Sequence, residues 1–128
     1  DPLGPSEGLF TADFYSNVHR LLKSQGVLVL QSESPRTRPN IFVEVYKSLE
    51  GIFGPAFVHC MLVSVPTYGP GMWSLTYCSK GPHPLADINT EQQAALMEHH
   101  SLQYYNPEIH RAAFALPGYV KDMLGVSL

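Results

Sequence analysis

The chain has 128 residues and a formal net charge of −3, with 45% apolar and 15% charged residues. This size and apolar content are typical of one small globular domain, and a charged share below about a quarter indicates a partly covered surface. The acidic balance argues against a nucleic-acid partner, and no apolar stretch approaches the roughly 20 residues of a membrane helix.

The first ten residues, Asp1–Phe10, predict a close-fitting loop. A carboxylate is followed there by two prolines and two glycines, which fix the backbone in some places and let it approach a ligand in others. We interpret Asp1 as the tip of a strand that precedes this sequence. Ligands of open α/β sheets bind outside such strand ends, so we expect part of a larger protein that begins inside its active site.

A helix and a strand are predicted next. Residues 11–25 carry one apolar stripe at helical spacing, Thr11 is a suitable N-cap, and Gly26 is a suitable stop. The run Val27–Leu30 has no polar alternation, which predicts a strand buried on both faces. The polar run that begins at Gln31 ends this strand abruptly.

A second helix and two further strands follow. The helix is predicted from its N-cap at Asn40 to a stop at Gly54, and the strands cover residues 56–65 and Met72–Ser79. The connector between the strands, Pro66–Gly71, is short enough for an antiparallel return, although it is long for a hairpin.

Three helical segments complete the chain. Thr90 begins a capping-box pattern before an apolar run, and short helices are predicted over Glu108–Phe114 and Gly118–Leu124. The order of a strand tip followed by α–β–α–β–β–α predicts the second half of an α/β unit.

Polar and aromatic side chains gather at the predicted strand ends. Asp1, Gln31, Tyr68 and Trp73 would converge on one edge of the sheet, and a carboxylate, an amide and aromatic rings there suit a flexible ammonium ion. Each residue also has a structural interpretation. Asp1 could be a loop charge, Gln31 could satisfy backbone groups, Tyr68 could pack in a turn, and Trp73 could belong to the core. Glu33, nearby, is expected to be solvated.

Other chemistry is not favoured by the sequence. Cys60 and Cys78 lie in apolar strand-like runs and are predicted to be reduced, buried thiols. Adjacent His99 and His100 point about 100° apart on a helix, so we predict no metal site from them and His110. No G-x-G-x-x-G or G-x-S-x-G occurs. Because no targeting segment is visible, cytoplasm is the expected location.

Four parts of the chain together resemble the spermidine synthase family of polyamine aminopropyltransferases: Asp1–Phe10, Gln31, Pro66–Gly71 and Tyr104–Pro117. The resemblance implies a Rossmann-like, methyltransferase-type α/β domain that follows a small β-domain. Residues 1–128 would be the C-terminal portion of the catalytic domain, without the β-domain and the first half of the Rossmann-like domain. Its mixed sheet would hold Met72–Ser79 antiparallel between the other two strands.

The same resemblance implies an activity. Family members transfer an aminopropyl group from decarboxylated S-adenosylmethionine, the co-substrate, to putrescine, and release spermidine and methylthioadenosine. The implied enzyme needs no prosthetic group and no metal, and it is a homodimer or homotetramer.

The resemblance also implies two sets of contact residues. The acceptor amine would be held by Asp1, Gln31, Tyr68 and Trp73. The adenine or methylthioadenosine moiety would be flanked by Pro5 and Leu9. No catalytic residue is assigned in this chain, because the expected general-base aspartate precedes Asp1 in the family motif. We therefore expect these 128 residues to be inactive alone, and we assign only a packing role to Tyr104–Pro117.

Three alternatives stay open. The protein could use another acceptor, such as spermidine, agmatine or cadaverine. It could be a catalytically dead regulatory subunit that keeps the polyamine pocket. A methyltransferase is less favoured, because Asp-Pro-Leu-Gly-Pro is not the usual ending of the corresponding strand.

Overall fold

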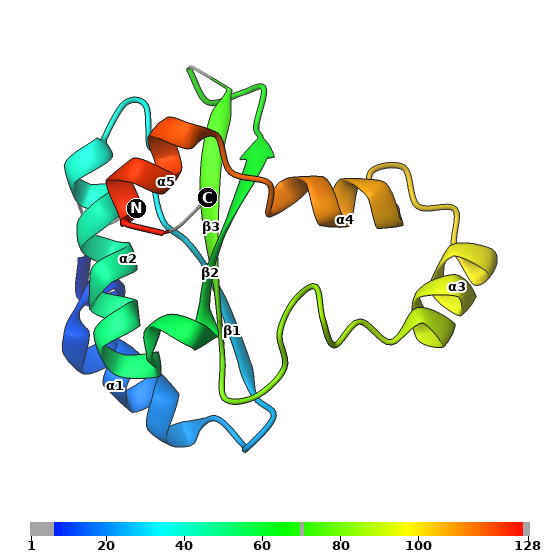
Figure 1. The fold of residues 1–128 in the computed structure, drawn as a ribbon, viewed down its shortest axis with the longest axis horizontal. Coiled ribbons are helices and arrows are strands. Elements are labelled where there is room, and N and C mark those ends of the chain that lie inside the picture. Colours follow the sequence, from blue (N-terminus) through cyan, green and yellow to red (C-terminus); the bar gives the residue numbers. More distant parts are fainter. Residues whose placement is uncertain (1–6, 70, 127–128) are drawn as a thin grey trace.

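The computed structural model describes residues 7–69 and 71–126. The chain forms short 3-10 turns, helices and strands in the order η1 (Glu7–Phe10), α1 (Ala12–Leu21), β1 (Val27–Gln31), α2 (Pro39–Phe53), η2 (Pro55–Phe57), β2 (Val58–Ser64), β3 (Met72–Ser79), α3 (Thr90–His99), α4 (Pro107–Ala113) and α5 (Gly118–Leu124) (Figure 1). None of the helices in these ranges has the length and hydropathy for a membrane span.

The three described strands form one sheet in the order β1-β3-β2. β3 is antiparallel to both neighbours, with Gln31 opposite Leu75 and Val63 opposite Trp73. The α/β fold and the central, antiparallel position of Met72–Ser79 are therefore confirmed. Because β1 and β2 run in the same direction, their carboxyl ends and the start of β3 meet at one edge of the sheet.

The core lies between the sheet and α1, α2 and α5, which cover the same face (Figure 1). Its buried members come from the sheet and from all three helices, and they are Tyr15, Phe42, Val45, Tyr46, Leu49, Phe53, Val58, Cys60, Cys78, Val120 and Leu124. Both cysteines are free thiols, as predicted, and burial raises the pKa of each to about 12. Burial therefore keeps them protonated and unreactive.

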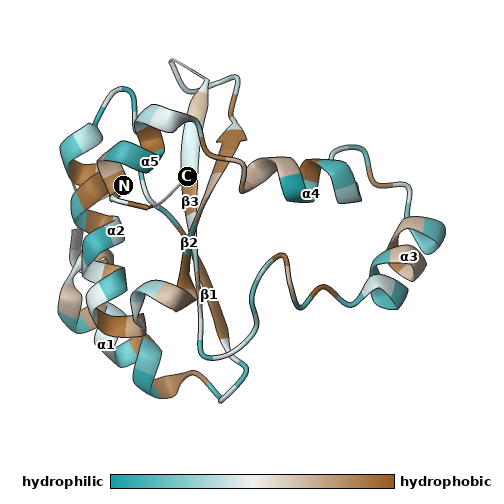
Figure 2. Cartoon of the chain, in the orientation of Figure 1, coloured by the Kyte–Doolittle hydropathy of each residue, from teal (hydrophilic) through white to brown (hydrophobic). Residues whose placement is uncertain are grey.

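The second face of the sheet is less covered. α4 lies beside it and α3 reaches away from it (Figure 1), while Figure 2 shows apolar residues along β1 and β2. Val27 and Val29 are 39% and 49% exposed, so the prediction that this strand is buried on both faces is wrong for the described structure. The reason is that α1 and α2 cover one face only, and β1 alternates between the two faces.

Two of the three predicted helix N-caps shift by one or two residues. Thr11 caps α1 as predicted, since its hydroxyl accepts a hydrogen bond from Phe14 N at 3.2 Å. α2 begins at Pro39, because proline suits the first helical turn, where no amide donor is needed. The cap of α3 is Asn89, not Thr90, and its side-chain oxygen accepts a hydrogen bond from Gln92 N at 2.9 Å.

Candidate functional site

The structure brings three of the predicted acceptor residues to the same edge of the sheet. Gln31 is the last residue of β1 and is exposed, Trp73 is the second residue of β3, and Tyr68 lies in the loop between β2 and β3. The rings of Tyr68 and Trp73 meet edge to face, with centroids 4.7 Å apart. The edge therefore carries an aromatic wall beside an amide.

Hydrogen bonds shape the loop that carries Tyr68. Val65 N donates to Gly71 O at 2.7 Å, and Gly71 N donates to Tyr68 O at 2.7 Å. Gly71 has a φ of 75°, a conformation that glycine adopts without strain. The loop thus holds the Tyr68 ring against Trp73, whose indole Nε1 is buried without an acceptor in the described part of the chain.

The predicted nucleoside residues stay predictions. Leu9 lies in η1 with 52% of its surface exposed, and η1 packs on α1. Asp1 and Pro5 fall outside the described residues.

Glu33 was expected to be solvated, and this expectation is wrong. The residue is 2% exposed, and neither carboxylate oxygen has a hydrogen-bond partner within the described ranges. Its nearest charged group there is Arg38, whose Nη1 lies 3.9 Å from Oε1. A buried carboxylate without hydrogen bonds is unfavourable unless a cationic partner completes it. Glu33 is therefore a candidate site residue that sequence reasoning missed.

A β-bulge explains the burial of Glu33. Ser32 N donates to Ser74 O at 3.1 Å, and Ser74 N donates to Glu33 O at 3.0 Å, so two residues beyond β1 face one residue of β3. Bulges often redirect a side chain beside a functional site. Glu33 has a φ of 72°, in the left-handed region that non-glycine residues rarely adopt. In the sequence, the only signal was the polar run after an apolar strand.

The chemistry of this edge suits an organic cation. A carboxylate forms charge-assisted hydrogen bonds to an ammonium group, and aromatic rings provide apolar walls and cation–π attraction for the attached carbon chain. Between residues 7 and 126, Pro70 aside, no group of three or more His, Cys, Asp or Glu side chains could hold a metal ion.

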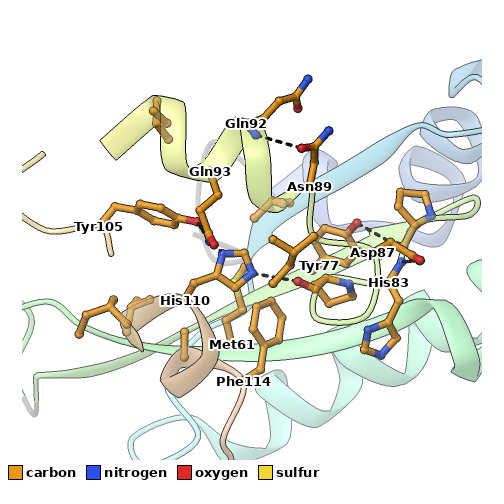
Figure 3. Close-up of a pocket in the computed structure, with 18 of the residues that line it drawn as sticks. Met61, Tyr77, His83, Asp87, Asn89, Gln92, Gln93, Tyr105, His110 and Phe114 are labelled. Atoms are coloured by element: carbon orange, nitrogen blue, oxygen red, sulfur yellow. Dashed lines mark hydrogen bonds between the residues drawn. The ribbon is translucent and has the colours of Figure 1, made fainter. Parts of the chain in front are cut away.

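A cavity of about 560 Å³ lies between the second face of the sheet and the α3–α4 segment (Figure 3). Its polar groups bind one another. Gln93 Nε2 donates to Tyr105 Oη at 2.7 Å, the Tyr105 hydroxyl lies 3.1 Å from His110 Nδ1, and His110 Nε2 lies 2.9 Å from Pro84 O. These contacts join α3, α4, the loop between them and the loop after β3, which agrees with the packing role predicted for Tyr104–Pro117.

A pair of histidines joins β2, which carries His59, to the loop after β3, which carries His83. The rings of His59 and His83 are 4.4 Å apart, and His59 Nε2 is buried without a partner among the residues that the structure describes. Burial, and then the charge of His83, lower the pKa of His59. His83 Nδ1 accepts hydrogen bonds from the backbone amides of Leu85 and Ala86, so it shapes the loop after β3.

Comparison with known proteins gives one consistent family. Residues 1–91 match the family described as "Spermine/spermidine synthase domain". Proteins named polyamine aminopropyltransferase are similar to nearly the whole chain: that of Moorella thermoacetica is 40% identical over 124 residues, or 97% of this chain and 41% of the relative. That of Desulforudis audaxviator is 38% identical over 122 residues, or 95% of this chain and 42% of the relative.

Solved structures point to the same family. A spermidine synthase in complex with the transition-state analogue AdoDATO superposes with a TM-score of 0.90 at 36% identity, covering 98% of this chain and 42% of the other. The spermidine synthase of Thermotoga maritima superposes with a TM-score of 0.87, also at 36% identity and with the same coverage of both chains. The chain thus spans about two fifths of the length of the relatives it matches.

Proposed function

The chain belongs to the spermine/spermidine synthase family, and from this premise we propose that the protein transfers an aminopropyl group from decarboxylated S-adenosylmethionine to putrescine. The products are spermidine and methylthioadenosine. The observation that carries the proposal is the edge cluster of Gln31, Glu33, Tyr68 and Trp73: at the end of β1 an exposed amide and a buried carboxylate without a hydrogen bond in the described ranges share the sheet edge with two rings in edge-to-face contact.

The reaction needs a neutral amine. A primary alkylamine has a pKa near that of lysine, about 10.4, so it arrives protonated at neutral pH and must lose a proton before it can attack carbon. The nitrogen then forms a bond to the aminopropyl carbon next to the sulfonium, and the carbon–sulfur bond breaks with its electron pair on sulfur. The leaving group is the neutral thioether methylthioadenosine. Positioning of the two substrates supplies much of the acceleration.

The acceptor side of this reaction is assigned to the edge cluster. Glu33 binds the distal ammonium, which stays charged, while Tyr68 and Trp73 contact the methylene chain and Gln31 hydrogen-bonds the amine. Asp1 is assigned to the same ammonium, and Pro5 and Leu9 to the nucleoside, as the family resemblance implies. The base that takes the proton is assigned to a part of the protein outside these 128 residues. Assembly as a homodimer or homotetramer and a cytoplasmic location stay predictions.

The test is product analysis with the full-length protein. Incubated with decarboxylated S-adenosylmethionine and putrescine, it should form methylthioadenosine and spermidine in equal amounts. The 128-residue chain alone should form neither.

Parallel reactions separate the alternatives. If spermidine, agmatine or cadaverine is turned over faster than putrescine, that amine is the acceptor in place of putrescine. Polyamine binding without transfer would indicate a regulatory subunit, and methyl transfer from S-adenosylmethionine would overturn the proposal.

A further inference from the structure

Three hydroxyl groups are buried side by side beneath the bulge at Glu33. Ser32, Ser74 and Thr76 are each 0% exposed. Thr76 Oγ1 donates to Ser32 Oγ at 2.7 Å, Ser32 Oγ and Ser74 Oγ lie 2.8 Å apart, and Ser74 Oγ donates to Glu33 O at 2.6 Å. We call these three side chains the hydroxyl chain.

The hydroxyl chain has one direction. Each hydroxyl carries a single hydrogen, and that of Ser74 is committed to the Glu33 carbonyl. Ser32 must therefore be the donor to Ser74, as Thr76 is to Ser32. All three donors point toward the backbone of Glu33, and hydrogen bonds aligned in this way polarise and strengthen one another.

The chain ends on the backbone position that is under strain. Glu33 O accepts from both the hydroxyl and the amide of Ser74, at 2.6 and 3.0 Å. Glu33 holds its φ of 72° although glutamate disfavours this region. A strained conformation persists where its surroundings over-determine it, and such strain gathers at functional sites.

We propose that the hydroxyl chain is a positioning device: through Ser74 it fixes the left-handed backbone of Glu33 and so aims the buried carboxylate at the acceptor ammonium. This inference rests on the proposed function, because it assigns Glu33 to the acceptor amine. Ser74 is a positioning residue, since it acts through Glu33 and contacts no substrate. A side chain without a hydroxyl at this position leaves the backbone of Glu33 with one donor in place of two.

The experiment uses the full-length protein and the variant Ser74→Ala. The control is Ser79→Ala, which removes a hydroxyl from a serine that is also buried, at the other end of the same strand. We expect Ser74→Ala to raise the acceptor KM about tenfold and to leave the donor KM unchanged. Ser74→Thr, which keeps the hydroxyl, should restore the acceptor KM. Ser79→Ala should have the wild-type acceptor KM.

A double-mutant cycle distinguishes positioning from general destabilisation. If Ser74 acts through Glu33, Ser74→Ala adds little to the acceptor KM in a Glu33→Gln background. Equal effects of Ser74→Ala in both backgrounds overturn the proposal. Thr76→Val removes the far link of the hydroxyl chain at nearly constant volume, and it serves the same cycle if Ser74→Ala does not fold.

A crystal structure of Ser74→Ala gives a readout that does not depend on activity. The proposal expects residue 33 to leave the left-handed region, and an unchanged φ near 72° overturns it. A wild-type protein that transfers no aminopropyl group would instead overturn the proposed function, and the crystal structure would still decide whether Ser74 holds the backbone of Glu33.

Discussion

Replacement of Glu33 by glutamine should make the protein more stable and a poorer catalyst. The substitution keeps the length of the side chain and its backbone strain but removes the charge. In the free protein the carboxylate is 2% exposed and has no hydrogen bond within the described residues, so its charge is only partly compensated, by Arg38 at 3.9 Å, until the acceptor ammonium arrives. When the acceptor binds, the same charge becomes favourable. The two measurements should therefore move in opposite directions.

The magnitude follows from the surroundings of the carboxylate. Burial of an ion costs several kcal/mol. Arg38, 3.9 Å away and 41% exposed, offsets about half of this cost, because the attraction between two opposite charges near a surface is at most about 4 kcal/mol at this distance. An unsatisfied glutamine amide costs about 1–3 kcal/mol. The difference leaves Glu33→Gln about 1 kcal/mol more stable, or roughly 2–4 °C higher in Tm for a protein of this class.

The catalytic loss is larger. A hydrogen bond to a charged group contributes about 2 kcal/mol, which corresponds to a rise of about 30-fold in the acceptor KM. Thermal unfolding without substrate and steady-state kinetics with varied putrescine measure the two effects. Glu44→Gln, on the exposed face of α2, is the matched control and should change neither. A Glu33→Gln protein with the Tm and acceptor KM of this control would refute the reasoning.

Two further predictions concern the stability of the fold. Lys47 Nζ donates to Leu124 O at 2.5 Å, at the last residue of α5, so Lys47→Met should destabilise the protein by about 1–2 kcal/mol and speed amide exchange in α5; unchanged exchange would contradict this role. The pKa of His59 is lowered by burial and by His83, with Tyr77 also facing its ring, so the unfolded state binds the proton first and stability falls as pH drops below about 6.5. His59→Phe should reduce this loss in urea titrations between about pH 7 and 5, whereas the same change at exposed His99 should not.

Much of the fold follows from local patterns and the family resemblance. The apolar stripes of α1 and α2 predict helices because their spacing repeats every turn, and the resemblance supplies the central position of β3. Helix starts shift by one or two residues because neighbouring caps compete, as Asn89 and Thr90 do. The exposure of Val29 could not be predicted, since a run of apolar residues reports the chemistry of both faces and not what covers them.

The position of Glu33 could not be predicted for a different reason. Its burial depends on a bulge that Ser74 forms from 41 residues away, and no local pattern encodes a hydrogen bond over that separation. The sequence Gln31-Ser32-Glu33 read alone is a polar strand end, which is usually solvated. Tyr68 and Trp73, at the same edge, are predictable because each is an aromatic residue at a strand end or in the adjoining loop, which the local sequence shows.

The start of β3 couples the register of the sheet to the proposed site. Trp73 and Ser74 are consecutive, so their side chains lie on opposite faces of the strand: one provides the aromatic wall and the other anchors Glu33. A slip of one residue between β1 and β3 would turn the side chains of β1 to the other face relative to β3 and would separate Ser74 from Glu33. The pairing of Gln31 with Leu75 therefore determines both the burial of the core face and the contact of Ser74 with the backbone of Glu33. Any substitution that weakens this register should impair acceptor binding before it unfolds the protein.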